Sequence, residues 1–181
     1  MENNAKKNNS IQRIAGKNAR KDAVKSFILK LEIESGLSCK DVWHNALLTS
    51  AAYTNIFNKS IMPQRSTLLC LGVAFRLNHE QMKKLFELAG YVYPYYAEEM
   101  VVDYFARKDL YACDELRNKY PAIDLYRINE LLTRLGLSEL GNEKTKNLHK
   151  EAVGAIINAI SVSEKFEEEV LDFIRNNKEI I

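Results

Sequence analysis

Apolar side chains recur at three- and four-residue spacing from residue 21 almost to the end of the chain, and this periodicity limits the fold more than any other feature. The spacing places apolar groups on one face of an α-helix, whereas a half-buried strand alternates every second residue. Helix breakers are also scarce. The 181 residues include seven Gly and three Pro, where average usage gives about twenty-two of the two together. The sequence therefore predicts an all-α protein and argues against turn-rich β architectures.

Capping residues and breakers divide the chain into expected helices. A first helix ends at Gly36, Ser38 caps a short second one, and a third starts after Thr49 or Ser50. A fourth begins near Leu68. The fifth is expected between Asn78, as its N-cap, and Gly90. Later helices are expected around residues 100–105, 110–116, 123–135, 148–160 and 166–174.

The charge of the chain is unevenly distributed. Residues 1–25 carry seven basic and two acidic side chains, a net charge of +5; because the whole chain carries +2, the rest carries −3. The start of the chain is also rich in Asn and poor in apolar residues, which is typical of disorder. We therefore predict a disordered basic arm. Such an arm attracts polyanions, most commonly nucleic acid, and the alternative is a solubilising tail without a partner.

These features divide the chain into three regions. Residues 1–20 are the predicted arm, residues 21–92 a first helical domain, and residues 93–181 a second helical domain for dimerisation or partner binding. The boundary is placed at the aromatic turn of residues 91–96, because Pro94 cannot continue a helix.

Residues 36–69 hold the most specific pattern in the sequence. Gly36-Leu37-Ser38 precedes the second helix, and a polar N-cap begins the third, in which Ile56 takes a core position. Pro63 and then Thr67-Leu68-Leu69 open the fourth helix. Apolar residues fall where two short crossing helices would clamp together, namely Val42, Leu48, Tyr53 and Ile56.

This pattern resembles the lambda-repressor/Cro-type (XRE-like) helix-turn-helix family. The stretches Leu85–Tyr91 and Val101–Phe105 resemble, more weakly, the helical extension that follows such domains in some bacterial regulators. The resemblance implies a repressor-like five-helix domain followed by a C-terminal helical domain. It also implies a bacterial or phage regulator of transcription that binds double-stranded DNA.

In such a complex the third helix lies in the major groove, and its exposed side chains read base edges. The expected base-facing residues are Ser50, Ala51, Thr54, Asn55 and Asn58. The expected phosphate contacts are Lys59, Arg65 and, from the arm, Arg13, Lys17, Arg20 and Lys21. Because Lys59 is the only charge at the third helix, the alternative is that the fold serves as a protein-binding scaffold.

The inventory of chemical groups argues against an enzyme. His44, His79 and His149 lie on three expected helices without a metal-ligand spacing, and His79 is expected at the surface. No Gly-rich phosphate loop or GxSxG elbow is present. Acidic pairs such as Glu98-Glu99 point about 100 degrees apart on a helix and are interpreted as solvated faces. We therefore predict no enzyme, no cofactor and no metal.

The cysteines point to a structural role. Cys39, Cys70 and Cys113 are an odd number without CxxC spacing, and each lies in an apolar helical pattern. We predict that all three are small core residues rather than parts of a disulfide framework.

Two further features concern partners. Four of nine tyrosines lie between residues 91 and 96; Tyr93, Tyr95 and Tyr96 form either a partner interface or, as we favour, the filling of the seam between the helical halves. A wide apolar run at residues 152–160 predicts the core of the C-terminal domain or a homodimer interface.

The expected location is the cytoplasm. No apolar run approaches the roughly 20 residues that cross a bilayer, and the N-terminus lacks the apolar block of a signal peptide. The sequence thus favours a sequence-specific DNA-binding regulator. The alternative is a non-enzymatic regulator or inhibitor that binds another protein or a nucleoprotein complex through the tyrosine-rich seam or the acidic C-terminal helix.

Overall fold

The computed structural model describes residues 2–58, 61–146 and 164–177, and the regular structure in these ranges is entirely helical. In chain order the helices are α1 (Glu2–Ser35), α2 (Cys39–Asn45), α3 (Ser50–Asn58), α4 (Arg65–Ala74), α5 (His79–Ala89), α6 (Ala97–Lys108), α7 (Asp114–Lys119), α8 (Ile123–Arg134) and α10 (Glu164–Asn177). The all-α prediction is confirmed. No helix in these ranges is long and apolar enough to cross a membrane.

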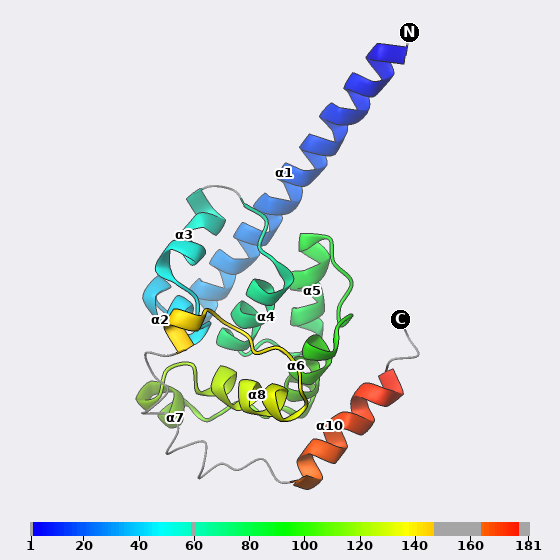
Figure 1. Cartoon of the computed structure of the whole chain (residues 1–181). Helices are drawn as coiled ribbons and strands as arrows, with labels where there is room; N and C mark the ends of the chain where they lie inside the picture. The colour runs from blue at the N-terminus through cyan, green and yellow to red at the C-terminus, as the bar shows by residue number, and fades with distance from the viewer. Residues whose placement is uncertain (1, 59–60, 147–163, 178–181) are drawn as a thin grey trace.

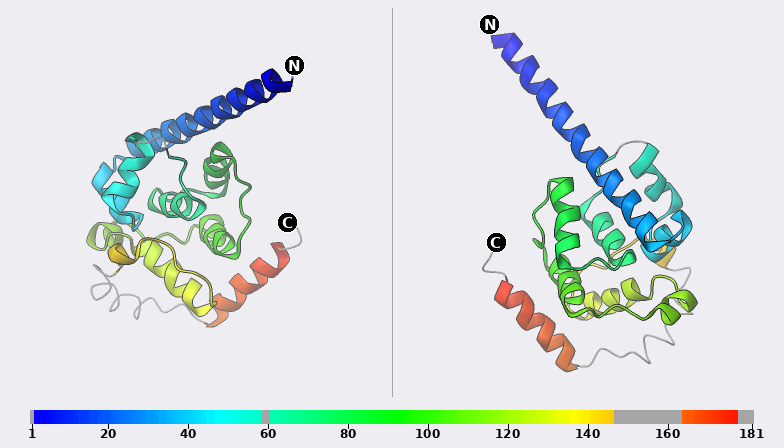
Figure 2. Two further views of the ribbon diagram at one scale, coloured as in Figure 1. Left: turned by 45° about the horizontal axis from the view of Figure 1, so that its top comes forward. Right: turned by 180° about the vertical axis from the view of Figure 1, so that it is seen from behind.

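Helix α4 lies in the centre of the body, with other helices packed around it (Figure 1, Figure 2). Its residues from Leu68 to Ala74 are all buried, as expected for a helix that is apolar around most of its circumference. At Gly72 the neighbouring α5 comes very close, because a Cβ at this position would lie 2.3 Å from Sδ of Met82. A methyl group at Gly72 would therefore force the buried end of the Met82 side chain to move.

Helix α1 runs without interruption through the segment expected to be a disordered arm. It begins at Glu2, and its N-terminal half projects away from the other helices (Figure 1). Its C-terminal half packs along α5 and is anchored by the buried side chains of Val24, Ile28 and Leu31. Each residue added to an existing helix forms one further hydrogen bond, so the anchored helix continues outward although this segment holds several Asn and a Gly, which are poor helix formers. The structure thus differs from the prediction of disorder: residues 2–20 form a helical arm.

The local signals at the start of α2 and α5 were predictable. Ser38 and Asp41 form a reciprocal capping box at the start of α2, and Asn78 and Gln81 form another at the start of α5. Helix α5 ends at Gly90, whose φ of 83° is the left-handed conformation that glycine adopts without strain.

The seam predicted at residues 91–96 is packed. The ring of Tyr93 is buried and lies 4.6 Å from the ring of Phe86 in α5, measured between centroids. Buried side chains before and after this seam belong to one apolar cluster that includes Val24 of α1 and Val170 of α10. The division into two domains at residue 92 stays a prediction. The residues before and after the seam are joined by this shared apolar cluster.

The helix expected around residues 110–116 lies later in the chain than predicted, because α7 begins only at Asp114 and ends at Lys119. The preceding backbone is held by side chains of other elements. The amide of Ala112 donates to Oδ1 of Asp124 at 2.7 Å, and Arg76 donates to the Ala112 carbonyl. These bonds satisfy backbone groups that a longer helix would have paired.

At the C-terminal end, α10 packs against α6 through aromatic rings. Tyr104 of α6 lies edge-on to Phe166 and Phe173 of α10, with centroids 5.7 Å and 5.3 Å away. This helix agrees with the one expected around residues 166–174. The helix expected around residues 148–160, and with it the apolar run from which a homodimer was predicted, lies outside the described residues.

One of the three cysteine predictions is confirmed. Cys70 is buried in α4, and burial raises the pKa of its thiol to about 12. The prediction is wrong for Cys39 and Cys113, which are exposed. Both lie where a helix starts at the surface of the body, as the first residue of α2 and the N-cap of α7, so the apolar pattern around them does not bury them.

Candidate nucleic-acid interface

Helix α3 is fixed to the body along one face. Tyr53 and Ile56 are buried, and the Tyr53 hydroxyl donates a hydrogen bond to Oε1 of Glu32 in α1 at 2.6 Å. Burial, with the nearby Glu32 carboxylate, raises the pKa of Tyr53 well above its ordinary value, so the phenol keeps the proton that it donates. Thr49 caps the helix through its hydroxyl, which accepts from the amide of Ala52 at 3.1 Å.

The opposite face of α3 carries short polar side chains. Ser50, Ala51, Thr54 and Asn58 are exposed, and Asn55 is half-buried. In the described part of the chain, Ser50, Thr54 and Asn55 form no side-chain hydrogen bond. Their donors and acceptors are therefore available to another molecule. Lys59, the expected phosphate contact at the end of this helix, lies outside the described residues.

The turn between α2 and α3 is clamped from behind by a distant segment. Leu47 has a φ of 49° and is buried. Its carbonyl accepts from the amide of Asn142 at 2.8 Å and from the hydroxyl of Thr145 at 2.9 Å. Gly141 lies so close that a Cβ there would be 2.7 Å from Cβ of Leu47. This contact between the turn and residues 141–145 could not be predicted, and Gly141 is its only sequence signal.

The arm carries basic side chains on α1. Lys17 and Arg20 are exposed and Lys21 is half-buried. The Arg20 guanidinium lies over Gly90, where a Cβ would be 2.7 Å from its Nη1. This is the C-terminal end of α5, whose dipole favours a cation. The side chain of Arg13 lies outside the described set.

Arg65, by contrast, is half-buried and paired with groups of the body. Its Nε and Nη2 donate to the two carboxylate oxygens of Glu99, each at 2.6 Å, and Nη2 also donates to the Val92 carbonyl at 2.7 Å. Four aromatic rings surround the guanidinium, with centroids 5.0 to 5.5 Å from Cζ: Phe86, Tyr91, Tyr95 and Tyr96. The Nε and Nη2 side of the guanidinium is thus occupied by Glu99 and is not available for a bidentate contact with a phosphate.

The partner of Arg65 corrects a second prediction. Glu99 was expected on a solvated face, but it is buried and pairs with Arg65. Its Oε2 also accepts from the backbone amide of Tyr95 at 2.7 Å. Adjacent Glu98 and Glu99 do point in different directions, as expected on a helix, but the direction of Glu99 is inward, where only a cation from another element can balance it.

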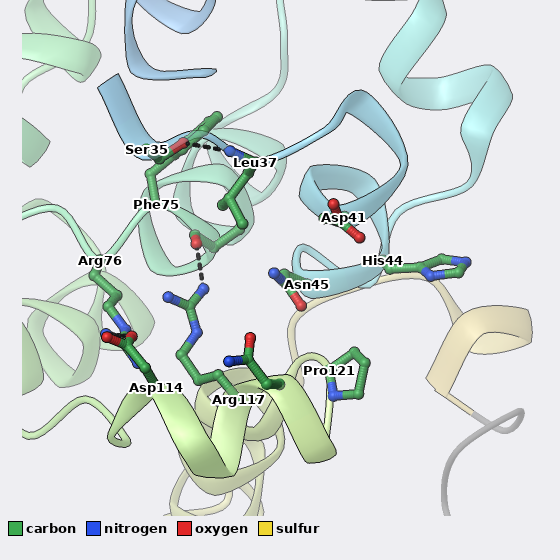
Figure 3. Close-up of a pocket in the computed structure, with 12 residues that line it drawn as sticks. Ser35, Leu37, Asp41, His44, Asn45, Phe75, Arg76, Asp114, Arg117 and Pro121 are labelled. Carbon is green, nitrogen blue, oxygen red and sulfur yellow. Dashed lines mark hydrogen bonds and ion pairs between the residues drawn. The ribbon is translucent and has the colours of Figure 1, made fainter. Parts of the chain in front are cut away.

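A cavity of about 590 Å³ lies below α2 (Figure 3). Its walls come from α2, from the residues after α4 and from α7, and Arg117 projects into it. Nη2 of Arg117 donates to the Ala74 carbonyl at 2.5 Å. Burial and the neighbouring charge of Arg76 lower the pKa of Arg117. Because Asp41 and Asp114 also line the cavity, its charges are balanced and do not favour a ligand of one sign.

Beside this cavity, a buried carboxylate joins the two parts of the body. Asp124 of α8 faces the three arginines Arg76, Arg117 and Arg127 at 4.0, 3.5 and 3.8 Å. Burial raises the pKa of Asp124 in spite of these cations. No group of three or more His, Cys, Asp or Glu side chains suited to a metal ion occurs in the described ranges.

Comparisons with known proteins do not place the chain in a family. No protein-family model matches it, and neither the curated proteins nor the solved structures include a significant match.

Proposed function

We propose that this chain is a sequence-specific DNA-binding regulator in which α2 and α3 form a helix-turn-helix, α1 to α5 a repressor-like domain, and the later helices a C-terminal domain. The observation that carries the proposal is the outer face of α3. Its polar groups have no hydrogen-bonding partner in the described part of the protein, while Tyr53 and Ile56 hold the opposite face rigidly.

The side chains on that face suit base edges. Asn55 can form a bidentate pair with adenine, Ser50 and Thr54 can bond a base or a phosphate, and Ala51 can contact a thymine methyl. The N-terminal residues of a recognition helix are the ones that reach the bases, and Ser50, Ala51 and Thr54 lie in the first half of α3. The helix thus reads sequence through short, neutral groups.

Affinity in this proposal comes from the helical arm. Neutralised phosphates supply most of the binding free energy of DNA complexes. Lys17 and Arg20 are exposed on α1, whereas Arg65 is paired with Glu99. We therefore assign phosphate contacts to the arm, including Arg13 and Lys21, and not to Arg65. A homodimer remains part of the proposal, because the recognition helices of two protomers, each of low affinity, can together bind two half-sites about one DNA turn apart.

The test is a fluorescence-anisotropy titration of the full chain against labelled duplexes of random sequence, at about 50 mM and about 200 mM salt. We expect binding that weakens steeply with salt. Selection from a randomised duplex pool should then return a consensus, and Asn55→Ala should change it at one position. Asn176→Ala, an exposed asparagine on α10, is the matched control and should leave the consensus unchanged. The absence of binding at both salt concentrations would contradict the proposal.

A second candidate is supported by exposed apolar groups on the seam. Val92, Tyr95 and Tyr96 are 70%, 44% and 53% exposed, and aromatic side chains at this density are typical of protein interfaces. Under this alternative the helix-turn-helix is only a scaffold. Loss of interaction with a protein partner on changing Tyr95 and Tyr96, together with no DNA binding, would favour it.

A further inference from the structure

A second cavity, of about 430 Å³, lies between the start of α5, the seam and the end of α6. Its polar side is formed by Lys83 of α5 and Arg107 of α6, with His79 between them. Its other side is formed by Val92, Pro94 and Tyr95 of the seam. The volume is within the range of small-molecule sites, which are mostly apolar with a few convergent polar groups.

The polar side is organised by one buried carboxylate. Oδ1 of Asp103 lies 2.5 Å from Nδ1 of His79, and Oδ2 accepts from Nε of Arg107 at 2.7 Å. The prediction that His79 faces solvent is therefore wrong, because Asp103 holds its ring against α6. Two side chains from different helices are thus fixed before any ligand arrives, which lowers the entropic cost of binding.

The hydrogen bonds also define which groups remain available. Nη2 of Arg107 lies 2.9 Å from Nε2 of His79. A guanidinium only donates hydrogen bonds, so Nε2 of His79 faces a donor, while Nδ1 faces the Asp103 carboxylate. The charge of Asp103 is matched by Arg107, and Lys83 has no ion-pair partner among the described residues.

The local charge is consequently positive. None of the described side chains that line the cavity is acidic. Glu80, the nearest carboxylate on the same helix, is exposed and lies 3.9 Å from Nε2 of His79, outside the lining. An anion in this cavity would meet Lys83 and Arg107, and the one carboxylate that pairs with Arg107, Asp103, is buried behind the lining.

The aromatic side is held in place from within the body. The backbone amide of Tyr95 donates to Glu99, and the Val92 carbonyl accepts from Arg65. The same pair thus fixes both ends of the short segment that carries Pro94. The ring of Tyr95 remains 44% exposed, so a planar apolar group can pack against it at the cavity.

We propose that this cavity binds a small organic oxyanion on an aromatic ring, either a carboxylate or a phosphate ester. Lys83 and Arg107 bind the oxyanion, and Pro94 and Tyr95 contact the ring. The site is distinct from the α3 face, and the proposal does not depend on DNA binding. It also gives the exposed part of the seam a function other than a protein interface.

The test is an NMR titration of the full chain, without DNA, with benzoate, phenyl phosphate and inorganic phosphate. We expect at least one of the ring-bearing anions to bind about tenfold more tightly than inorganic phosphate, because only these fill the apolar side. Which of benzoate and phenyl phosphate binds better identifies the headgroup. The proposal would be overturned if neither benzoate nor phenyl phosphate binds. It would also be overturned if inorganic phosphate binds as tightly as the ring-bearing anions.

Matched variants locate the site. Lys83→Ala should weaken binding about tenfold, whereas Lys84→Ala removes the neighbouring exposed lysine of the same helix, which does not line the cavity, and should have no effect. Tyr95→Ala should weaken binding more than Tyr96→Ala, although both remove a ring from Arg65. Equal effects within either pair would overturn the assignment. Because no DNA is present, these results are independent of the proposed DNA binding.

Discussion

The cations of the helical arm and those of the body differ in what surrounds them. Lys17 and Arg20 are exposed on α1, with the Arg20 guanidinium lying over Gly90 at the end of α5. In the body, Arg65 is enclosed by Glu99 and aromatic rings, and Arg117 is half-buried beside Asp124. Cations of equal charge therefore have different roles. A solvated cation can neutralise a phosphate, whereas a buried cation balances a carboxylate whose burial without a partner would destabilise the fold.

The sharpest test of this comparison is Arg65→Ala. It leaves the buried Glu99 without its cation, so we expect the free energy of unfolding to fall by about 3 to 5 kcal/mol, measured by urea denaturation followed by circular dichroism. Lys84→Ala removes an exposed cation and should change it by less than about 0.5 kcal/mol. A loss for Arg65→Ala as small as that of the control would show that the buried pair contributes no more than a surface charge.

A second test concerns how the body holds the turn before α3. Gly141→Ala would place a methyl group 2.7 Å from Cβ of Leu47 at a φ of 94°, and we expect a loss of about 2 to 3 kcal/mol. Gly136→Ala is the control, because it also has a positive φ, 68°, but no atom within 4 Å of the added Cβ. Its loss should be about 1 kcal/mol. Equal losses in thermal or urea unfolding would mean that strain alone, without the contact to Leu47, explains the effect.

The third test changes only the arm. The triple variant Lys17→Ala, Arg20→Ala, Lys21→Ala should weaken binding to all duplexes about tenfold and reduce the salt dependence. The unfolding free energy should change little, because none of the three side chains is buried. The control removes three exposed lysines elsewhere, Lys84, Lys108 and Lys119. The same loss of affinity in both triple variants would indicate an effect of net charge and not of the arm.

The smallest effect concerns the thiols. Burial raises the pKa of Cys70 to about 12, so at pH 8 it should remain protonated and protected from a disulfide reagent. The exposed Cys39 and Cys113 should react in the native protein, which single Cys→Ser variants can assign. Cys70 should react only as the protein unfolds. Reaction of Cys70 at the rate of the exposed thiols would show that the reagent reaches α4 in the native protein.

Much of the fold could be predicted from local signals. The capping residues Ser38 and Asn78 mark helix starts correctly, and Gly36 and Gly90 mark helix ends. These signals work because they act within a few residues of the chain. The disorder expected for residues 1–20 is the main difference, since composition does not report that the anchored part of α1 continues outward.

The candidate site could be predicted only in part. The sequence places Ser50, Ala51 and Thr54 on a single helix, and the structure exposes them. It does not reveal that Arg65 pairs with Glu99, thirty-four residues later, or that residues 141–145 hold the turn at Leu47. Contacts between distant segments leave no periodic pattern, so sequence reading assigned Arg65 to phosphate and Glu99 to solvent.

The helical character of the chain, the ends of several helices and the concentration of positive charge near the N-terminus could all be predicted without the structure. Those properties follow from side-chain spacing, capping chemistry and charge count, which are local. Only the tertiary structure decided which charges are buried as pairs and which remain in solvent, because burial depends on the surface that distant helices cover together. For this protein that distinction separates the arm that we propose to bind DNA from the arginines that hold the body together.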